Sequence, residues 1–138
     1  MTVVPDASVI VKWVLPRNIS PFQEQALSLR DAAVARDIVL VVPALWRYEV
    51  GNTLARLVPE KAVAFLSFCS AVGLNEFIPD RRWLETSVGL VRRYGVTFYD
   101  AAYHALAICR SSIFVTADEK YERKVRGEGN IQLLEHWR

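Results

Sequence analysis

Short apolar runs alternate with longer amphipathic segments along this chain. The runs have the length of strands, and the run at 38–42 is apolar at every position, which is typical of a strand buried on both faces of a sheet. We therefore predict strands at Thr2–Val4, Ile38–Val42, Leu74–Ile78, Ser112–Ala117 and Ile131–Glu135.

The segments between these runs carry start and stop signals for helices. Ser20 is predicted to be an N-cap, with Pro21 at the first helical position and Gln23 completing a capping box. Asp80 and Thr97 are predicted to cap two later helices. The predicted helices span residues 7–14, 21–36, 43–57, 59–72, 81–94, 99–110 and 118–125.

Strands that alternate with helices predict an α/β fold. We expect a three-layer α/β/α sandwich with a central, mainly parallel sheet. No repeat, low-complexity tract or linker interrupts the pattern, so we expect a single domain over residues 1–138. In such sheets, sites form beyond the carboxyl ends of the strands, where the connections change direction.

Composition excludes several classes of protein. With 52% hydrophobic and 23% charged residues, the chain is typical of globular proteins. No apolar run reaches the ~18 residues of a membrane span, and the first residues lack a basic segment, so we expect neither a membrane protein nor a signal peptide. Cys69 and Cys109 lie outside any C-x-x-C pair, which favours a reducing cytoplasm. The net charge of +2 permits a polyanionic partner.

Four carboxylates lie at junctions between the predicted elements. Asp6 follows the first strand and Asp118 follows the fourth, so both are expected at the carboxyl edge of the sheet. Asp100 is the only charged residue in the otherwise apolar start of its helix, and Glu49 lies beside an apolar helix surface. A carboxylate placed in apolar surroundings is costly unless a partner compensates it.

Each acid taken alone also has a structural explanation. Asp6 and Asp118 could serve as turn or N-cap residues, Asp100 as part of a capping box, and Glu49 as a helix-surface acid. If the four converge, however, mutual repulsion raises their pKa values, and a hard divalent cation resolves that repulsion. The set therefore predicts a metal site suited to phosphodiester hydrolysis.

Four stretches of the sequence resemble, in order, the blocks of the PIN domain, and in particular the VapC-type toxins of toxin–antitoxin modules. They are “VVPDASVIVKWVLP”, “VPALWRYEVGNTLAR”, “TFYDAAYHALA” and “FVTADEKYERKV”, and together they cover nearly the whole chain. The resemblance implies a Mg²⁺- or Mn²⁺-dependent endoribonuclease. Its catalytic and metal-binding acids would be Asp6, Asp100 and Asp118, with Glu49 binding the ion directly or through another group.

The same resemblance implies roles for other groups. Ser8 and Thr116 would orient the carboxylates. The substrate would be RNA, hydrolysed by a metal-activated water to leave 5′-phosphate and 3′-hydroxyl ends. A small antitoxin would occlude the pocket, often with a basic side chain, and the protein would form a homodimer.

Several residues are candidates for contacts outside the acids. The basic residues near the acidic junctions are expected to hold the RNA backbone: Lys12, Arg17, Arg47 and Lys120. At Arg17 the chain departs from many relatives, which carry an acid there. Aromatic residues are candidates for partner surfaces, although we expect at least half of them in the core: Trp13, Trp46, Phe65, Phe68 and Trp83.

Other functions fit the sequence less well. A haloacid-dehalogenase-like phosphotransferase with an aspartyl nucleophile needs D-x-D after the first strand, and Ser8 occupies the third position here. A dinucleotide site is disfavoured because no G-x-G-x-x-G follows that strand. Glu122 is a further candidate acid, and His104 is expected to be a core or surface histidine. The alternative is a catalytically silent PIN-like module that binds metal or RNA.

Overall fold

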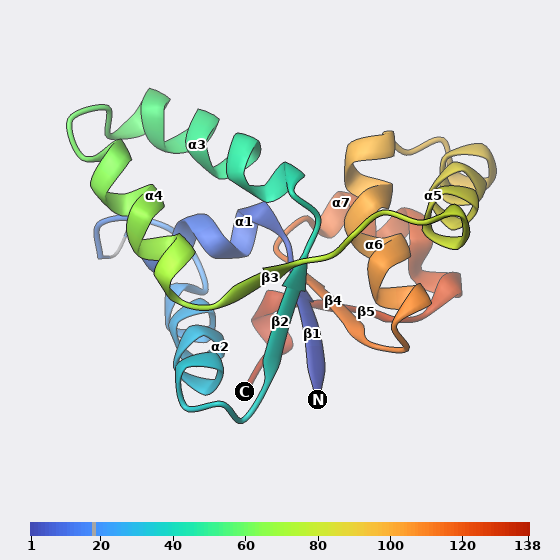
Figure 1. Ribbon diagram of the computed structural model, residues 1–138, viewed down its shortest axis with the longest axis horizontal. Helices are drawn as coiled ribbons and strands as arrows, with labels where there is room; N and C mark the ends of the chain where they lie inside the picture. The colour runs from blue at the N-terminus through green and yellow to red at the C-terminus, as the bar shows by residue number, and fades with distance from the viewer. Residues whose placement is uncertain (18) are drawn as a thin grey trace.

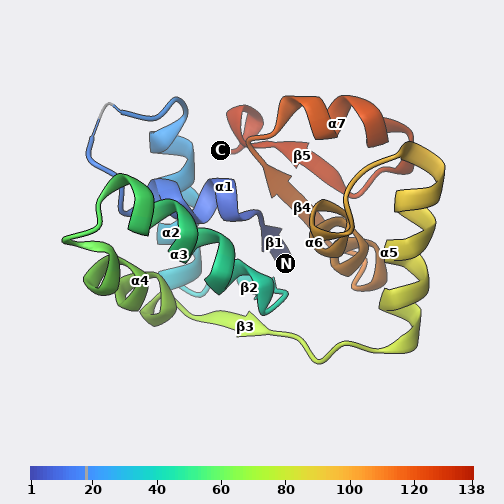
Figure 2. The ribbon, with the colours of Figure 1, turned by 90° about the horizontal axis from the view of Figure 1, so that it is seen from above.

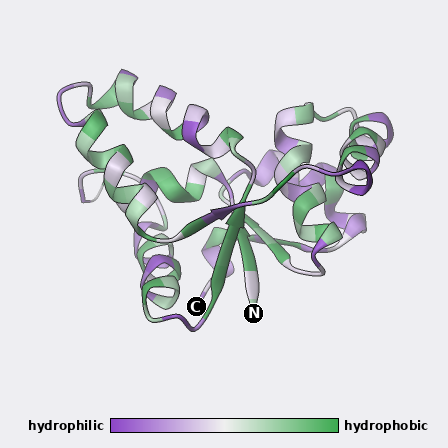
Figure 3. Ribbon diagram, in the orientation of Figure 1, coloured by the Kyte–Doolittle hydropathy of each residue, from purple (hydrophilic) through white to green (hydrophobic). Residues whose placement is uncertain are grey.

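The strands of this protein form one parallel sheet, as a computed structural model of residues 1–17 and 19–138 shows. Neighbouring strands pair in the order β3-β2-β1-β4-β5, and each pairing is parallel. The sheet lies at the centre of the molecule, and its middle strands are the most hydrophobic (Figures 1 and 3). The strands are β1 (Thr2–Pro5), β2 (Val39–Val42), β3 (Leu74–Glu76), β4 (Ile113–Thr116) and β5 (Ile131–Leu133).

Helices cover both faces of the sheet (Figure 2). The chain passes from β1 to β2 and β3 with its first four helices on one face, then crosses to β4 on the far side of β1 with the remaining helices on the other face. The predicted three-layer sandwich is therefore confirmed. The helices are α1 (Ala7–Ile10), α2 (Gln23–Val34), α3 (Leu45–Leu57), α4 (Ala62–Ala71), α5 (Arg81–Tyr94), α6 (Phe98–Cys109) and α7 (Glu119–Val125).

The direction of the connections changes between β1 and β4. Crossovers on the two sides of this point lead away from each other, which leaves a crevice at the carboxyl ends of these strands. Pro5 pairs with Val115, so the residues that follow the two strands lie side by side. Asp6 and Asp118 therefore leave the sheet at the same place.

The helix α6 forms the centre of the second helical layer. It is buried at every position from Ala101 to Ala107, and it packs against α5, β1 and β4. Its alanines permit this close approach to the sheet. Both ends of α5 are capped, because the predicted N-cap Asp80 accepts a hydrogen bond from the Trp83 N–H (2.9 Å) and Gly95 ends the helix with φ of 65°.

The predicted capping box at Ser20 is wrong. The helix α2 begins at Gln23, after Phe22 in a left-handed conformation (φ 60°). Ser20 instead accepts a hydrogen bond from the buried ammonium of Lys12, which also donates to the Pro21 carbonyl. Gln23 turns its amide toward the carbonyls of Lys12 and Leu15. Tertiary hydrogen bonds have thus replaced the local capping pattern.

Several other predicted boundaries move by a few residues. The first predicted helix is α-helical only over Ala7–Ile10, and a 3-10 turn follows it. The helix after Pro59 begins only at Ala62. The third and fifth strands end at Glu76 and Leu133, two residues early. The helix α7 ends at Val125, as predicted. Within the described residues, no helix is long and apolar enough to cross a membrane.

Candidate functional site

The carboxylate of Asp6 is held by three short hydrogen bonds at the end of β1. As the N-cap of α1, its Oδ1 accepts from the Ala7 N–H (2.9 Å). Its Oδ2 accepts from the hydroxyls of Ser8 (2.7 Å) and Thr116 (2.8 Å). The hydroxyl of Thr116 comes from the last residue of β4, so the side chains tie the two strand ends together.

The end of β4 completes this corner. Thr116 Oγ1 also accepts from the Asp118 N–H (3.0 Å), and Ser8 Oγ accepts from the Ala117 N–H (3.2 Å). Asp118 caps α7 by accepting from the Tyr121 N–H (2.9 Å). We call the group formed by Asp6, Ser8, Thr116 and Asp118 the strand-end corner. Its two acids have the capping roles of their structural explanation, and Asp118 also lines the crevice.

The other two predicted acids come from helices. Glu49 lies in α3 and accepts a 2.6 Å hydrogen bond from the hydroxyl of Tyr103, which is 1% exposed. The ring of Tyr103 stacks on Phe114 of β4. Asp100 lies in the first turn of α6, where its N–H donates to the N-cap Thr97 (3.1 Å). The helix N-terminus favours an anion at this position.

Burial raises the pKa values of three of the four acids, and charge repulsion adds to it. Burial raises the pKa of Asp6 to about 6; the Ser8 and Thr116 hydroxyls oppose the shift, and Asp100 adds to it. Burial raises the pKa of Glu49 to about 7, opposed by the Tyr103 hydroxyl and assisted by Asp6 and Asp100.

The negative charge of Asp100 acts on both Asp6 and Glu49, and Asp100 is in turn acted on by Asp118. Burial raises its pKa, the Thr97 hydroxyl lowers it, and the negative charge of Asp118 raises it again. Lys124 lowers it as a nearby cation. Neighbouring carboxylates therefore raise the pKa values of Asp6, Glu49 and Asp100, as expected where acids from several elements face one crevice.

Two neighbouring cavities open onto three of these acids and share Thr97 and Asp100. One of about 200 Å³ lies toward α7 and is lined by Asp118, Lys120 and Lys124. The other, of about 390 Å³, lies toward α3 and is lined by Glu49 and Asn52. We call the two together the acidic groove. Asp100 lies where the two cavities meet, the two lysines lie at one end, and Asp6 lines neither cavity.

The donor set of the groove fits a hard divalent cation, because carboxylate oxygens are the ligands that Mg²⁺ and Mn²⁺ prefer. Yet within residues 1–17 and 19–138 no three Asp, Glu, His or Cys side chains are grouped closely enough to hold one ion. The carboxylates share a crevice but are not drawn into a coordination sphere. Binding a cation would therefore require side-chain or helix movement toward it.

The predicted RNA-contacting cations lie in different surroundings. Lys120 is exposed and lines the acidic groove beside Asp118. Arg17 is exposed and lines a separate cavity with Ser20 and Phe22. Lys12 is only 6% exposed, and its ammonium is bonded inside the fold.

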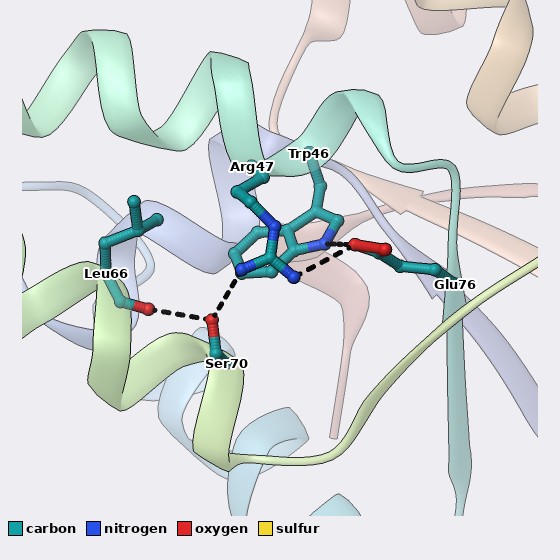
Figure 4. Close-up of polar contacts among 5 residues, drawn as sticks. All are labelled: Trp46, Arg47, Leu66, Ser70 and Glu76. Atoms are coloured by element: carbon teal, nitrogen blue, oxygen red, sulfur yellow. Dashed lines mark hydrogen bonds and ion pairs between the residues drawn. The ribbon is translucent and has the colours of Figure 1, made fainter.

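Arg47 belongs to a contact between α3, α4 and β3 (Figure 4). Its guanidinium donates to Glu76 (3.2 Å) and Ser70 (3.2 Å) and lies over the ring of Trp46, 5.0 Å from its centroid. The Trp46 N–H donates to the same Glu76 carboxylate (3.0 Å). The side chain therefore holds α3 in place, and of the predicted cations only Lys120 lines the acidic groove in the described part of the chain.

Sequence reasoning missed two residues of this site. Tyr103 lies three residues after Asp100 on the same helix, and that i,i+3 spacing was the available signal. Lys124 lies one turn after Lys120 on α7 and lines the same end of the groove. Neither residue type is specific enough by itself to be noticed without the fold.

Other candidate residues serve the fold. His104 is buried, with its ring nitrogens 3.0 Å from the Tyr121 hydroxyl and 2.8 Å from the Gly129 carbonyl oxygen. Glu122 pairs with Arg126 at 2.8 Å. Of the aromatic candidates for partner surfaces, Trp13 and Trp46 are buried, Phe65 and Trp83 are half-buried, and Phe68 is exposed.

Comparisons with known proteins bear on the family and the fold. A sequence profile of the PIN domain matches residues 3–127. A chain in the structure of FitAB bound to an IR36 DNA fragment has a TM-score of 0.65 and 15% identity, over 99% of this chain and 97% of that one. A chain of VapBC2 from Rickettsia felis, bound to a promoter DNA fragment, has a TM-score of 0.67 and 14% identity, over 96% and 97%. Curated protein sequences gave no match.

Proposed function

Because this chain belongs to the PIN-domain family, whose profile matches residues 3–127, we propose that it is a metal-dependent endoribonuclease. One observation carries the proposal beyond family membership. Acids from four separate elements lie around the switch point of the sheet, three of them on an open groove, and burial together with neighbouring carboxylates raises the pKa values of Asp6, Glu49 and Asp100. A purely structural role would not require this convergence.

The residues of the chain have distinct parts in the proposed reaction. Asp6, Asp100 and Asp118 would hold the divalent cation, and Glu49 would complete the negative site. The hydroxyls of Ser8 and Thr116 fix Asp6 and keep its pKa from rising further. When bound, a divalent cation would neutralise the acids, polarise the phosphodiester and make a water molecule more acidic.

Lys120 and Lys124 give the groove one end that attracts phosphate. An RNA backbone that enters there would have its charge compensated beside Asp118 and Asp100. Such contacts make binding weaken steeply as salt is raised.

The test is cleavage of a pool of folded RNAs in Mg²⁺ or Mn²⁺, with EDTA and Asp100→Asn as controls. Asparagine keeps the size of the side chain and removes its charge. Asp31→Asn is the matched control, because Asp31 is exposed and pairs only with Arg30 among the contacts of the described residues. We expect products with 5′-phosphate ends, loss of at least about 100-fold in Asp100→Asn, and unchanged cleavage in Asp31→Asn.

Two results would contradict the proposal. Cleavage by Asp100→Asn at the wild-type rate would place the activity elsewhere. Products ending in 2′,3′-cyclic phosphate would indicate attack by the RNA's own hydroxyl rather than by water.

A catalytically silent module is the second candidate, and one observation favours it. No three metal-ligating side chains are grouped among the described residues. On this alternative, Mn²⁺ or RNA would bind in calorimetry while no RNA is cut.

We also propose that the protein acts as the toxin of a toxin–antitoxin pair and forms a homodimer. The two similar solved chains, which share this fold, come from the FitAB and VapBC2 assemblies. An antitoxin that inserts a basic side chain into the acidic groove would meet Asp100 and Glu49. Co-expression with a small neighbouring gene product, followed by light scattering, tests both assemblies.

A further inference from the structure

An apolar cavity adjoins the acidic groove on the side away from Lys120 and Lys124. It has a volume of about 230 Å³, and aromatic rings and prolines form most of its wall. Leu45 and Tyr99 line both this cavity and the acidic groove, so the two are continuous. Its principal lining residues are Pro43, Phe77, Pro79, Trp83, Phe98 and Tyr99.

The aromatic wall is already in place. The ring of Trp83 lies edge-to-face with Phe77 (5.2 Å between centroids) and with Phe98 (5.7 Å). The Trp83 N–H donates to the Ala102 carbonyl (3.0 Å), which fixes the indole against α6. Phe98 and Tyr99 remain 38% and 61% exposed, so an incoming ring can reach them.

We propose that this cavity is a subsite for one nucleobase of a single-stranded RNA, next to the phosphate that enters the acidic groove. The inference rests on the nuclease function proposed above and adds to it a determinant of where the strand is cut. The volume suits one planar ring, because pockets for whole small-molecule ligands are larger, about 300–1,000 Å³.

The chemistry of the lining favours a base over a phosphate or a sugar. Among the described residues, no charged side chain lines the cavity. An anionic backbone would find no compensation there, whereas the π face of a base gains by stacking on aromatic rings. The strand would then run from the lysines at one end of the groove, past Asp100, to the aromatic wall at the other.

The subsite is expected to select by stacking. Few hydrogen-bonding groups face the cavity, so the edges of the base are hardly read, and purines should be preferred to pyrimidines for their larger rings. The preference would appear as a purine at a fixed distance from the cut.

The experiment measures binding of a labelled eight-nucleotide oligo(A) by fluorescence anisotropy. The divalent cation in the buffer is Ca²⁺, which also prefers oxygen ligands. The integrity of the RNA is checked on a gel after each titration. A second set of oligonucleotides carries one abasic ribose, moved position by position. The variants are Phe98→Leu and Tyr99→Leu, which keep an apolar side chain and remove the ring. Phe68→Leu is the control, since Phe68 is 48% exposed on α4 and lines neither the acidic groove nor the apolar cavity.

We expect the two ring variants to bind oligo(A) about 5- to 100-fold more weakly, and Phe68→Leu to bind it nearly as the wild type does. At one position, the abasic ribose should weaken binding to the wild type by a similar factor. At the same position it should not weaken binding to the ring variants any further. That non-additivity identifies the base that meets the ring. If Phe98→Leu does not fold, the more exposed Tyr99 decides the matter.

Other outcomes separate this proposal from the nuclease function. The subsite would be overturned if the losses of affinity from the abasic ribose and from the ring substitution were additive at every position. It would also be overturned if the protein bound no single-stranded RNA. Dissociation of an assembly in the ring variants, with RNA binding unchanged, would show that the cavity meets protein. Non-additive base effects without cleavage in Mg²⁺ or Mn²⁺ would keep the subsite and refute the nuclease.

Discussion

The strand-end corner and the helix-borne acids are held in place by different means. In the corner, the Asp6 carboxylate accepts from two hydroxyls and a backbone N–H, and the Asp118 carboxylate accepts from a backbone N–H. Bonds made by the Ser8 and Thr116 hydroxyls cross between the ends of β1 and β4. Glu49, in contrast, has one side-chain hydrogen bond, from Tyr103. Asp100 depends on the position of α6 and on the Thr97 cap.

This difference shows that one half of the site is held more rigidly than the other. The corner is fixed by the sheet, because strand pairing and packing together hold the ends of β1 and β4 in place. The distance from Glu49 to the corner instead depends on how α3 lies against the rest of the fold. That arrangement agrees with the absence of a three-ligand group among the described residues, since only one half of the site is locked.

Thr116→Val tests the corner and should have the largest effect of the three changes considered next. Valine has the shape of threonine but cannot donate to Asp6 or accept from the Asp118 N–H. We expect cleavage or metal affinity to fall about 10- to 100-fold, as when other groups that orient metal ligands are removed.

The matched control for this change is Thr86→Val. The Thr86 hydroxyl donates to the Arg82 carbonyl within α5, away from the acids. Metal titrations and cleavage rates measured on both variants should separate them clearly. Equal losses would mean that the corner does not orient the acids.

The pH dependence of stability tests one acid from each half of the site, Asp6 from the corner and Glu49 from α3. The pKa of Asp6 rises from 3.8 to about 6 on folding and that of Glu49 from 4.5 to about 7, so the folded protein binds these protons more tightly. Their contribution is fully present below the unfolded values and is lost as pH rises through the folded ones. In EDTA, the free energy of unfolding should fall by about 2–4 kcal/mol between pH 5 and pH 8, the lower figure allowing for solvent screening of the half-buried Glu49.

Urea unfolding at the two pH values measures this change. Asp6→Asn is the control, because asparagine can still accept from the Ala7 N–H and carries no charge. Its stability should depend less on pH than that of the wild type. A wild-type stability that rises between pH 5 and pH 8 would contradict the assigned directions.

Tyr103→Phe tests the helix-borne half and should have the smallest effect. Phenylalanine keeps the stacking on Phe114 and removes the hydrogen bond to Glu49. Without the hydroxyl the pKa of Glu49 should rise further, so the acidic limb of the pH–rate profile should move to higher pH. We expect kcat to fall about 3- to 5-fold with little change in KM.

Tyr121→Phe provides the comparison for that measurement. Tyr121 is also buried and packs on Phe114, but its hydroxyl meets His104. A shift of the pH profile in Tyr103→Phe alone would support the positioning of Glu49. The same shift in both variants would point to a general effect of packing.

Local signals predicted the parts of the fold that local forces control. The caps at Asp80 and Thr97 and the apolar strand runs were read correctly, because each depends on neighbouring residues. The predicted cap at Ser20 is wrong because its hydroxyl accepts a hydrogen bond from the buried Lys12, which lies in another segment. No pattern within the window 20–23 reveals that competition.

The candidate site could be outlined from the sequence because parallel strands bring their carboxyl ends to one edge. That rule placed Asp6 and Asp118 together before their contacts were known. The hydroxyl of Tyr103 and the apolar cavity could not be predicted in the same way. Both depend on how α5 and α6 pack against the rest of the fold, which spacing along the chain does not specify.

The pairing of β1 with β4 also determines when the acidic crevice can exist during protein synthesis. Thr116 and Asp118 are made more than 100 residues after Asp6. A nascent chain that has not yet exposed β4 and α7 outside the ribosome lacks Asp118 and the Thr116 hydroxyl that holds Asp6. The fold therefore delays assembly of its acids until β4 and α7 have been made, and chains truncated before β4 carry only a fragment of the site.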